Sequence, residues 1–190
     1  TLDEGGTPLI PTRAYGDHEI YVKDETRNPT GSHKDRALSV AINHGNSIGA
    51  QVTYIVSTGS AGISNAALSA RASMRSVIVM CEGTPMERLY PLYMLGATIV
   101  EVSGDIDLIV DLVADICRKN GLYSTSTSRK TNPYQSEGNK TIAYEIVDQL
   151  GKAPDWMVVP VGGGGSISGI WRGFCDLKRL NLITTCPKMI

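Results

Sequence analysis

The sequence lacks the features that mark several large classes of protein. Its formal net charge is −1 over 190 residues, so no excess of either sign points to nucleic acid or to an anionic membrane surface. No apolar run approaches the ~20 residues that a transmembrane helix needs. The segment that begins at Thr1 does not have the pattern of a secretory signal peptide, and no internal repeat or low-complexity stretch is present. We therefore expect a globular protein that binds neither nucleic acid nor membranes.

Patterns for metal binding and thiol redox chemistry are also missing. The four cysteines, Cys81, Cys117, Cys175 and Cys186, have no CxxC spacing, and the three histidines show no spacing typical of metal ligands. Three of the cysteines lie in apolar patterns, which are typical of reduced, buried thiols. The composition, with 42% hydrophobic and 19% charged residues, is that of an ordinary globular protein. The sequence therefore predicts a cytoplasmic protein without a metal site.

Expected strands and helices alternate along the chain, and this alternation predicts an α/β fold with open parallel sheets and flanking helices. The expected strands are Glu19–Val22, Val52–Val56, Val77–Cys81, Thr98–Val102, Leu122–Ser124 and Trp156–Val161. The expected helices are Lys34–Ser47, Ile63–Ser73, Met86–Leu95, Ile106–Asn120, Ser136–Leu150 and Ile167–Arg179. We predict a small domain over residues 28–132. Residues 1–27 and 133–190 would belong to a larger domain, with a ligand site in the cleft between the two.

The chain ends on a pattern that is typical of an unfinished sheet. Pro187–Ile190 has the composition of a further buried strand and then stops. We therefore expect the chain to be a fragment that is truncated at its C-terminal side.

One lysine lies where a turn meets a helix. In the segment Asn28–Arg36, Asn-Pro and Thr-Gly favour a turn, and Ser32 can cap the helix that begins at Lys34. The positive end of the helix dipole disfavours the ammonium form there and lowers the pKa of the amine. An amine that loses its proton can form a Schiff base with a carbonyl group. Taken alone, the motif also fits an exposed lysine without any chemistry.

A run of four glycines, Gly162, Gly163, Gly164 and Gly165, is followed by Ser166 and separates an apolar run from a helix. The preceding run, Asp155–Val161, is typical of a strand buried on both faces. Without side chains, the backbone N–H groups of the loop can converge on an anion, and Ser166 can cap the helix. The loop lacks the lysine of a Walker A motif and the third glycine of the dinucleotide fingerprint. It therefore predicts a phosphate site, while a plain strand-to-helix turn is the alternative.

A third loop carries small hydroxyl residues. Ser57, Thr58, Gly59 and Ser60 follow the expected strand Val52–Val56 and open a helix. Such residues at a helix N-terminus suit a carboxylate, although an ordinary capped helix start has the same pattern. A nucleophilic lysine, a phosphate loop and a carboxylate loop are together the parts needed to hold pyridoxal phosphate and an amino acid.

With these motifs, the chain resembles the fold-type II pyridoxal-phosphate enzymes of the tryptophan synthase β-like group, and within that group the threonine synthases. The resemblance runs from Gly6 to Ile190. It is carried by the segments Tyr21–Glu25, Asn28–Arg36, Ser57–Gly59, Asn132–Pro133, Glu137–Thr141 and Val159–Gly169. It implies the two-domain fold of that group, pyridoxal 5'-phosphate as cofactor, a small amino-acid substrate and a homodimer.

The resemblance also implies a reaction and residue roles. The reaction would be an elimination or replacement on the amino acid, most specifically the conversion of O-phosphohomoserine and water to threonine and phosphate. Lys34 would form the Schiff base and move protons at the substrate, and the loop of Gly162–Gly165 with Ser166 would hold the cofactor phosphate. Ser60 would lie at the cofactor ring. The residues implied in substrate binding are Ser57, Thr58, Gly59, Asn132 and Glu137.

Three departures from the family pattern leave alternatives open. Ser60 stands where the family usually has asparagine, and His33 stands where threonine synthases usually have phenylalanine. Gln135 stands where they commonly have an arginine that helps to hold the substrate phosphate, so a bidentate clamp is missing unless Arg129 and Lys130 replace it. The alternatives are a relative such as a cysteate or cysteine synthase or a serine/threonine dehydratase, and a non-catalytic homologue that binds the cofactor or an amino acid. A plain nucleotide-binding module is a third.

Overall fold

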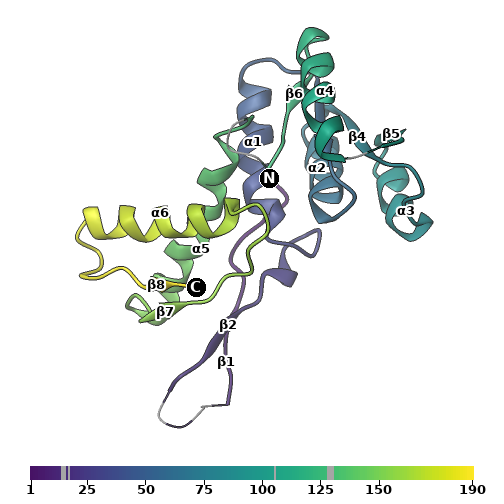
Figure 1. The fold of residues 1–190 in the computed structure, drawn as a ribbon. Coiled ribbons are helices and arrows are strands. Elements are labelled where there is room, and N and C mark those ends of the chain that lie inside the picture. Colours follow the sequence, from purple (N-terminus) through teal and green to yellow (C-terminus); the bar gives the residue numbers. More distant parts are fainter. Residues whose placement is uncertain (14–15, 17, 105, 128–130) are drawn as a thin grey trace.

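The computed structural model describes residues 1–13, 16, 18–104, 106–127 and 131–190, without the side chains of residues 106–108. Arg129 and Lys130, which the sequence suggests as replacements for the missing clamp, lie outside these residues. One part of the molecule holds a four-stranded sheet, a second holds two packed helices, and helix α1 (Lys34–Ser47) contacts both (Figure 1). Among the described residues, no helix is both long enough and apolar enough to cross a bilayer.

The main sheet has the strand order β5-β4-β3-β6, and all of its neighbouring strands are parallel. The strands are β3 (Val52–Val56), β4 (Arg75–Cys81), β5 (Thr98–Val102) and β6 (Tyr123–Ser124), and the helices between them are α2 (Ser60–Arg71), α3 (Met86–Met94) and α4 (Ile106–Lys119). Ile55, Ile78 and Met80 on the two central strands are 2% exposed or less. Parallel strands between helices are buried on both faces, and the apolar runs of this sequence are what such strands require. The predicted α/β fold with a parallel sheet is confirmed.

Three helices pack unusually closely around glycines. A Cβ atom added to Gly138 of α5 (Gln135–Leu150) would overlap the backbone of Arg36 in α1. Gly169 and Gly173 of α6 (Gly165–Arg179) lie against α5 in the same way, with Ser136 O at 2.9 Å and Lys140 O at 2.7 Å from the added Cβ. Because these positions have no side chain, the start of α1, the start of α5 and α6 can meet at one place.

Two small sheets differ from what the sequence predicts. β1 (Leu9–Pro11) was not expected, and it forms an antiparallel hairpin with β2 (Tyr21–Lys23) that projects from the helices (Figure 1). The expected strand Trp156–Val161 is shorter. Only Trp156–Met157 forms β7, and it pairs in parallel with β8 (Lys188–Met189).

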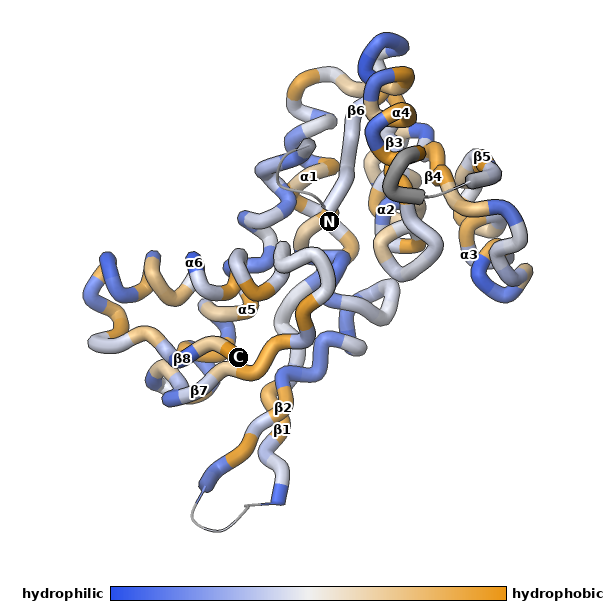
Figure 2. Tube along the Cα trace, in the orientation of Figure 1, coloured by the Kyte–Doolittle hydropathy of each residue, from blue (hydrophilic) through white to orange (hydrophobic). Residues whose placement is uncertain are grey.

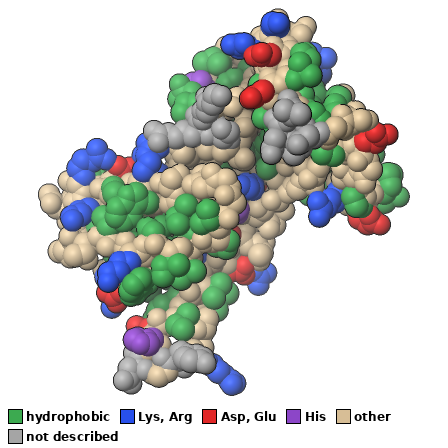
Figure 3. Space-filling view, viewed as in Figure 1, with side chains coloured by type: hydrophobic (Ala, Val, Ile, Leu, Met, Phe, Trp, Pro, Cys, Tyr) green, Lys and Arg blue, Asp and Glu red, His purple; other side chains and the backbone are tan. Residues whose placement is uncertain are grey.

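The expectation that this last run is buried on both faces is also wrong. The run is apolar along most of its length (Figure 2), but Trp156, Val158 and Val161 are 55%, 71% and 60% exposed. The reason is that β8 is its only neighbouring strand among the residues that the structure describes. Hydrophobic side chains accordingly gather at the surface over α6 and β7 (Figure 3).

The apolar core consists of two clusters. The first joins α1, α2 and α3 to β3 and β4, and includes Leu38, Ile55 and Leu92. The second joins α5 and α6, and includes Ile142 and Phe174. The division into domains at residues 28 and 132 remains a prediction.

Candidate active site

Lys34 is the first residue of α1, as the sequence predicts. The preceding turn is fixed by Asp35, whose carboxylate accepts hydrogen bonds from Thr30 N at 2.7 Å and Thr30 Oγ1 at 2.5 Å. The Lys34 N–H donates to Ser32 Oγ at 3.2 Å. His33, and not Ser32, is the N-cap residue, and its own side chain makes no capping bond. Ser32 satisfies the helix end from one residue further out, because the turn brings its hydroxyl back over the first N–H.

The amine of Lys34 is half-buried, and burial lowers its pKa. Desolvation penalises the ammonium form, so more of the amine is unprotonated at a given pH than in water. This is the direction that the sequence predicts, and burial is a cause that the sequence did not reveal. Burial likewise lowers the pKa of His33, with a further contribution from the charge of Lys34.

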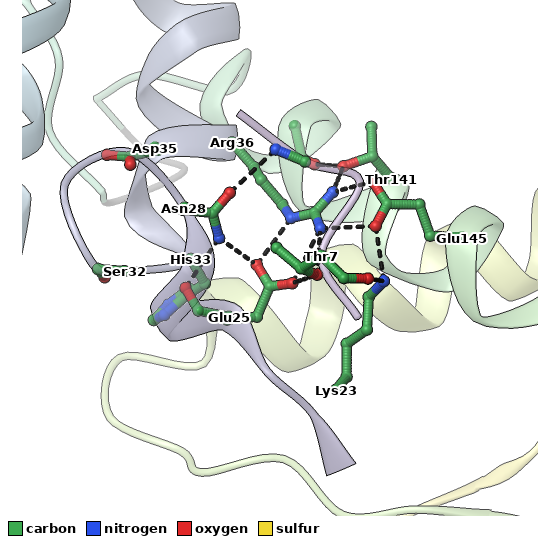
Figure 4. A network of polar contacts seen from close by, with 12 residues as sticks. Thr7, Lys23, Glu25, Asn28, Ser32, His33, Asp35, Arg36, Thr141 and Glu145 are labelled. Carbon is green, nitrogen blue, oxygen red and sulfur yellow. Dashed lines mark hydrogen bonds and ion pairs between the residues drawn. The ribbon is translucent and has the colours of Figure 1, made fainter. Parts of the chain in front are cut away.

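Arg36 anchors the Lys34 end of α1 to two other segments (Figure 4). Its Nε and Nη2 donate to the Glu25 carboxylate at 2.7 and 2.8 Å. Its Nη1 and Nη2 donate to the Glu145 carboxylate at 2.6 and 2.8 Å, and further bonds reach Thr141 Oγ1 and Thr7 Oγ1. The guanidinium is thus held between η1 (Glu25–Arg27) and α5, and both acids engage it through two oxygens.

The charges of this network are strongly coupled. Burial opposes the charged form of Arg36, but the hydrogen bonds and charges of Glu145 and Glu25 outweigh it and raise the pKa of the guanidinium. Burial also opposes ionisation of Glu145, yet Arg36 and Lys23 together lower the pKa of that carboxyl to about 2. Lys23 Nζ donates to Glu145 Oε2 at 2.6 Å and to Thr7 O at 2.6 Å. The β1–β2 hairpin is therefore tied to the same acid as α1.

The glycine loop leads directly into α6, which begins at Gly165 rather than at Ile167. Gly164 is the N-cap residue with φ +77°, a left-handed conformation that favours glycine. A Cβ atom added to Gly162, Gly163 or Gly164 would have no neighbour within 4 Å. Ser166 lies in the first turn and does not cap the helix, and its hydroxyl is 2.9 Å from His33 Nε2. This contact joins the loop to the residue before Lys34.

A pocket of about 120 Å³ lies between the lysine turn and the glycine loop. The residues that line it are His33, Lys34, Thr127, Gln135, Asn139, Pro160, Gly162, Gly163, Gly164, Gly165, Ser166 and Ile167. A second hollow of about 200 Å³, lined by α1 and α2 residues such as Ile42 and Leu68, shares no residue with it. The structure thus brings Lys34 together with the glycine loop, which are the two motifs that the sequence singled out most strongly.

Two amide side chains in this pocket were not predicted to take part in the site. Gln135 and Asn139 are 1% and 2% exposed, and Gln135 Nε2 and Asn139 Oδ1 have no hydrogen-bond partner in the described part of the chain. The sequence flagged Gln135 and His33 only as departures from the family pattern. A usable signal was the four-residue spacing of the two amides, which places both on one face of a helix.

The hydroxyl-rich loop lies elsewhere. Ser57, Thr58 and Gly59 connect β3 to α2, and none of them lines the Lys34 pocket. Ser57 Oγ accepts a bond from Gly59 N at 3.2 Å, and Thr58 O accepts one from Arg88 Nη1 at 3.2 Å. Ser60 is the first residue of α2, three residues earlier than the predicted helix start, and it is exposed. The substrate and ring roles of these residues remain predictions.

Asn132 and Glu137 also lie outside the pocket lining. The Asn132 amide donates to Ser124 O at 2.7 Å and accepts from Tyr134 N at 3.0 Å, so it holds the loop before α5. The Glu137 carboxylate pairs with Lys140 at 2.6 Å and with Arg172 at 2.9 Å, and links α5 to α6. Within the described residues, no group of three His, Cys, Asp or Glu side chains could hold a metal ion.

Comparisons with known proteins give the family of the chain. A family model described as pyridoxal-phosphate dependent enzyme matches residues 1–190. The chain is 38% identical over 195 residues to a threonine synthase of Methanocaldococcus jannaschii, with 100% of this chain and 47% of the relative covered. It is 37% identical over 196 residues to a threonine synthase of Synechocystis sp., with coverages of 100% and 50%. The chain therefore spans about half the length of these curated relatives.

A solved structure supports the same fold. The crystal structure of an O-ureido-L-serine synthase superposes with a TM-score of 0.78 at 26% identity, covering 93% of this chain and 58% of that one.

Proposed function

The chain belongs to the family of pyridoxal-phosphate-dependent enzymes, and we propose that it catalyses an elimination or replacement on a small amino acid. Lys34 is the proposed residue that binds the cofactor carbonyl. The observation that carries the proposal is the convergence of the Lys34 amine and the glycine loop on one pocket. The cofactor of the family is pyridoxal phosphate.

The pocket residues fit this cofactor. The loop of Gly162, Gly163 and Gly164 offers backbone N–H groups at the start of a helix and no side chain that would block a phosphate. The Lys34 amine, with its lowered pKa, lies in the same pocket. The unpartnered amide atoms of Gln135 and Asn139 leave polar groups there that a bound ligand can satisfy.

Each of these residues has a task in the proposed reaction. When bound, the cofactor supplies a conjugated ring that accepts the electrons of the amino acid's α-carbon. Lys34 would hold the cofactor at its carbonyl carbon, and its Nζ, once released from the cofactor, would take and return a proton at the substrate. The glycine loop orients the phosphate. His33, through its contact with Ser166, joins the glycine loop to the lysine turn.

The specific reaction that we propose first is that of a threonine synthase, in which O-phosphohomoserine and water give threonine and phosphate. It is supported by the names of the two curated relatives at 38% and 37% identity. The second candidate is a lyase or synthase that acts on an amino acid without a phosphate ester. It is supported by Gln135, because a neutral amide occupies a pocket position where a guanidinium would pair with a phosphate dianion.

The cofactor assignment is tested on the full-length protein. We expect an absorbance band in the visible range on addition of pyridoxal phosphate, and, after borohydride reduction and peptide mapping, a mass adduct on Lys34. Lys34→Ala should lose the adduct, whereas Lys152→Ala, which changes an exposed lysine outside the pocket, should keep it. A colourless, unmodified wild-type protein would instead favour a non-catalytic homologue.

The reaction is tested by turnover. Phosphate release from O-phosphohomoserine with formation of threonine supports the first candidate. A keto acid from serine or threonine, or a thioether from acetylserine and an added thiol, without phosphate release from phosphohomoserine, supports the second. The homodimer and the cytoplasmic location remain predictions that accompany the proposal.

A further inference from the structure

The least expected feature of the pocket is its pair of unsatisfied amides. Gln135 Nε2 and Asn139 Oδ1 are buried, and neither has a hydrogen-bond partner in the described structure. An orphaned polar atom of this kind costs roughly 1–3 kcal/mol of stability, so a fold does not keep two in one pocket without a gain elsewhere. Both residues line the pocket that Lys34 and the glycine loop share.

The two amides differ in whether a hydrogen bond fixes their orientation. The Asn139 amide is oriented by its Nδ2, which donates to Gly165 O at 3.4 Å, and this leaves Oδ1 as the free atom. Reversing the amide would set Oδ1 against the Gly165 carbonyl oxygen, which is unfavourable. The Gln135 amide lies beside the same residue, with Nε2 at 3.6 Å from the position of a Cβ added to Gly165. The pocket therefore presents a fixed acceptor and, one helical turn earlier, a free donor.

We propose that Gln135 and Asn139 form a subsite for a neutral hydroxyl group carried by the amino-acid ligand, an inference that rests on the proposed function. A hydroxyl can accept a hydrogen bond from the Gln135 amide and donate one to Asn139 Oδ1, so this one type of group offers what each orphaned atom lacks. A phosphate dianion only accepts, and would therefore repel Asn139 Oδ1. The two residues are thus specificity-determining and favour a β-hydroxy amino acid over its counterpart without the hydroxyl.

Matched ligand pairs test this on the full-length protein loaded with pyridoxal phosphate. The pairs are L-threonine with L-2-aminobutyrate, and L-serine with L-alanine, which differ only in the hydroxyl. Affinities are measured by calorimetry and by the visible absorbance change. We expect the hydroxy member of at least one pair to bind roughly fivefold to thirtyfold more tightly, which corresponds to one to two net hydrogen bonds of about 1 kcal/mol each. A ratio near one in both wild-type pairs overturns the proposal and leaves the amides to a bound water.

Variants of Gln135 and Asn139 test whether these residues cause the preference for a hydroxyl group, measured as the affinity ratio of each ligand pair. In Gln135→Met and Asn139→Leu, which keep the approximate volume, the ratio should fall towards one. In Gln51→Met, which changes an exposed glutamine outside the pocket, it should stay at the wild-type value. Preferences that survive both pocket variants contradict the proposal.

Thermal unfolding without an amino acid gives an independent readout. Removing an orphaned polar atom should leave the unfolding temperature of Gln135→Met unchanged or raise it. A marked decrease would show that the amide has an internal role and would overturn the proposal.

Failure of this inference is separable from failure of the proposed function. A protein that carries the cofactor on Lys34 but shows no hydroxyl preference loses only the subsite. A protein that takes up no cofactor loses the proposed function, and calorimetry on it still reports the ratio for each ligand pair.

Discussion

Replacing Gly138 by alanine tests how closely α1 and α5 must approach. The added Cβ would overlap the Arg36 carbonyl oxygen and lie 2.5 Å from the Arg36 carbonyl carbon and 2.9 Å from Ala37 Cα. Ordinary contacts of a Cβ begin at 3.4 Å, so the two helices must separate by about 0.9 Å to relieve the contact with the carbonyl carbon, and by more to relieve the overlap with the carbonyl oxygen. All three obstructing atoms belong to the backbone of a helix, and none can move away by rotation of a side chain.

The magnitude follows from two opposing terms. Overpacking of a tight interior costs typically 1–3 kcal/mol, and a clash with rigid backbone belongs at the upper end, about 3 kcal/mol or more. Alanine is better than glycine inside a helix by about 1 kcal/mol, which offsets part of this. We therefore expect a net loss of about 2 kcal/mol, or roughly 2–8 °C in the unfolding temperature, with the smaller shift for a longer chain. The cofactor should also bind more weakly, because Lys34 lies two residues before the displaced Arg36.

Thermal unfolding and cofactor titration of the full-length Gly138→Ala variant measure both effects. Gly163→Ala is the matched control for stability, because its added Cβ has no neighbour within 4 Å. An unfolding temperature of Gly138→Ala at or above that of the wild type would refute the reasoning, since the helix-propensity gain would then exceed the packing cost.

Three further outcomes are expected. Gly163→Val should leave the unfolding temperature unchanged, because a Cβ at this position has no neighbour within 4 Å. It should weaken cofactor binding at least tenfold in a spectroscopic titration, because a branched side chain would cover the loop N–H groups. Cofactor binding as tight as in the wild type would exclude the loop as the phosphate site. The pKa of Glu145 is lowered to about 2 in the folded state, so its contribution to stability is complete above its unfolded pKa of about 4.5 and is lost as pH falls from there towards 2. The urea midpoint of the wild type should therefore fall over this pH range, and that of Glu145→Gln should fall less. Asp148→Asn, which changes an exposed acid on the same helix, should show the same pH dependence as the wild type. Arg36→Met should destabilise the protein by about 3–5 kcal/mol, because Glu25 loses the cation that it pairs with and Glu145 keeps only Lys23. Adding Glu25→Gln should restore part of the loss, and no restoration would mean that Arg36 contributes packing rather than charge.

The parallel sheet could be predicted because its pattern is local. The strands Val52–Val56 and Thr98–Val102 were predicted with their observed bounds, and helix Lys34–Ser47 likewise. Buried parallel strands are continuous apolar runs, and the glycines and polar residues between them mark their ends. Lys34 and the glycine loop were found for a similar reason. Each is a short motif whose chemistry depends on a turn and a helix start, and both can be recognised within ten residues.

Features that depend on distant partners could not be predicted. The apolar run after Trp156 was expected to be buried on both faces, but the number of neighbouring strands decides burial, and sequence periodicity does not give that number. The same holds for Gly138, Gly169 and Gly173, whose need for a missing side chain becomes visible only when α1 lies against the first and α5 against the other two. Isolated glycines inside a helix cost about 1 kcal/mol each, and three in two adjacent helices are a signal of close packing that a reading of the sequence could use.

The position of Gln135 shows why a family pattern alone does not identify the substrate. An arginine there would bring a charge that pairs with a phosphate dianion through two hydrogen bonds. The glutamine brings a neutral donor, and its neighbour in the pocket, one turn away, is an acceptor that Gly165 holds in place. The positive charge available in the described pocket lining is then confined to Lys34 and His33, whose pKa values are both lowered by burial. The glycine loop can bind one phosphate, which the cofactor supplies, but a second phosphate on the substrate would meet an acceptor and no guanidinium. If phosphohomoserine is nevertheless the substrate, its phosphate must be bound by residues outside the described pocket.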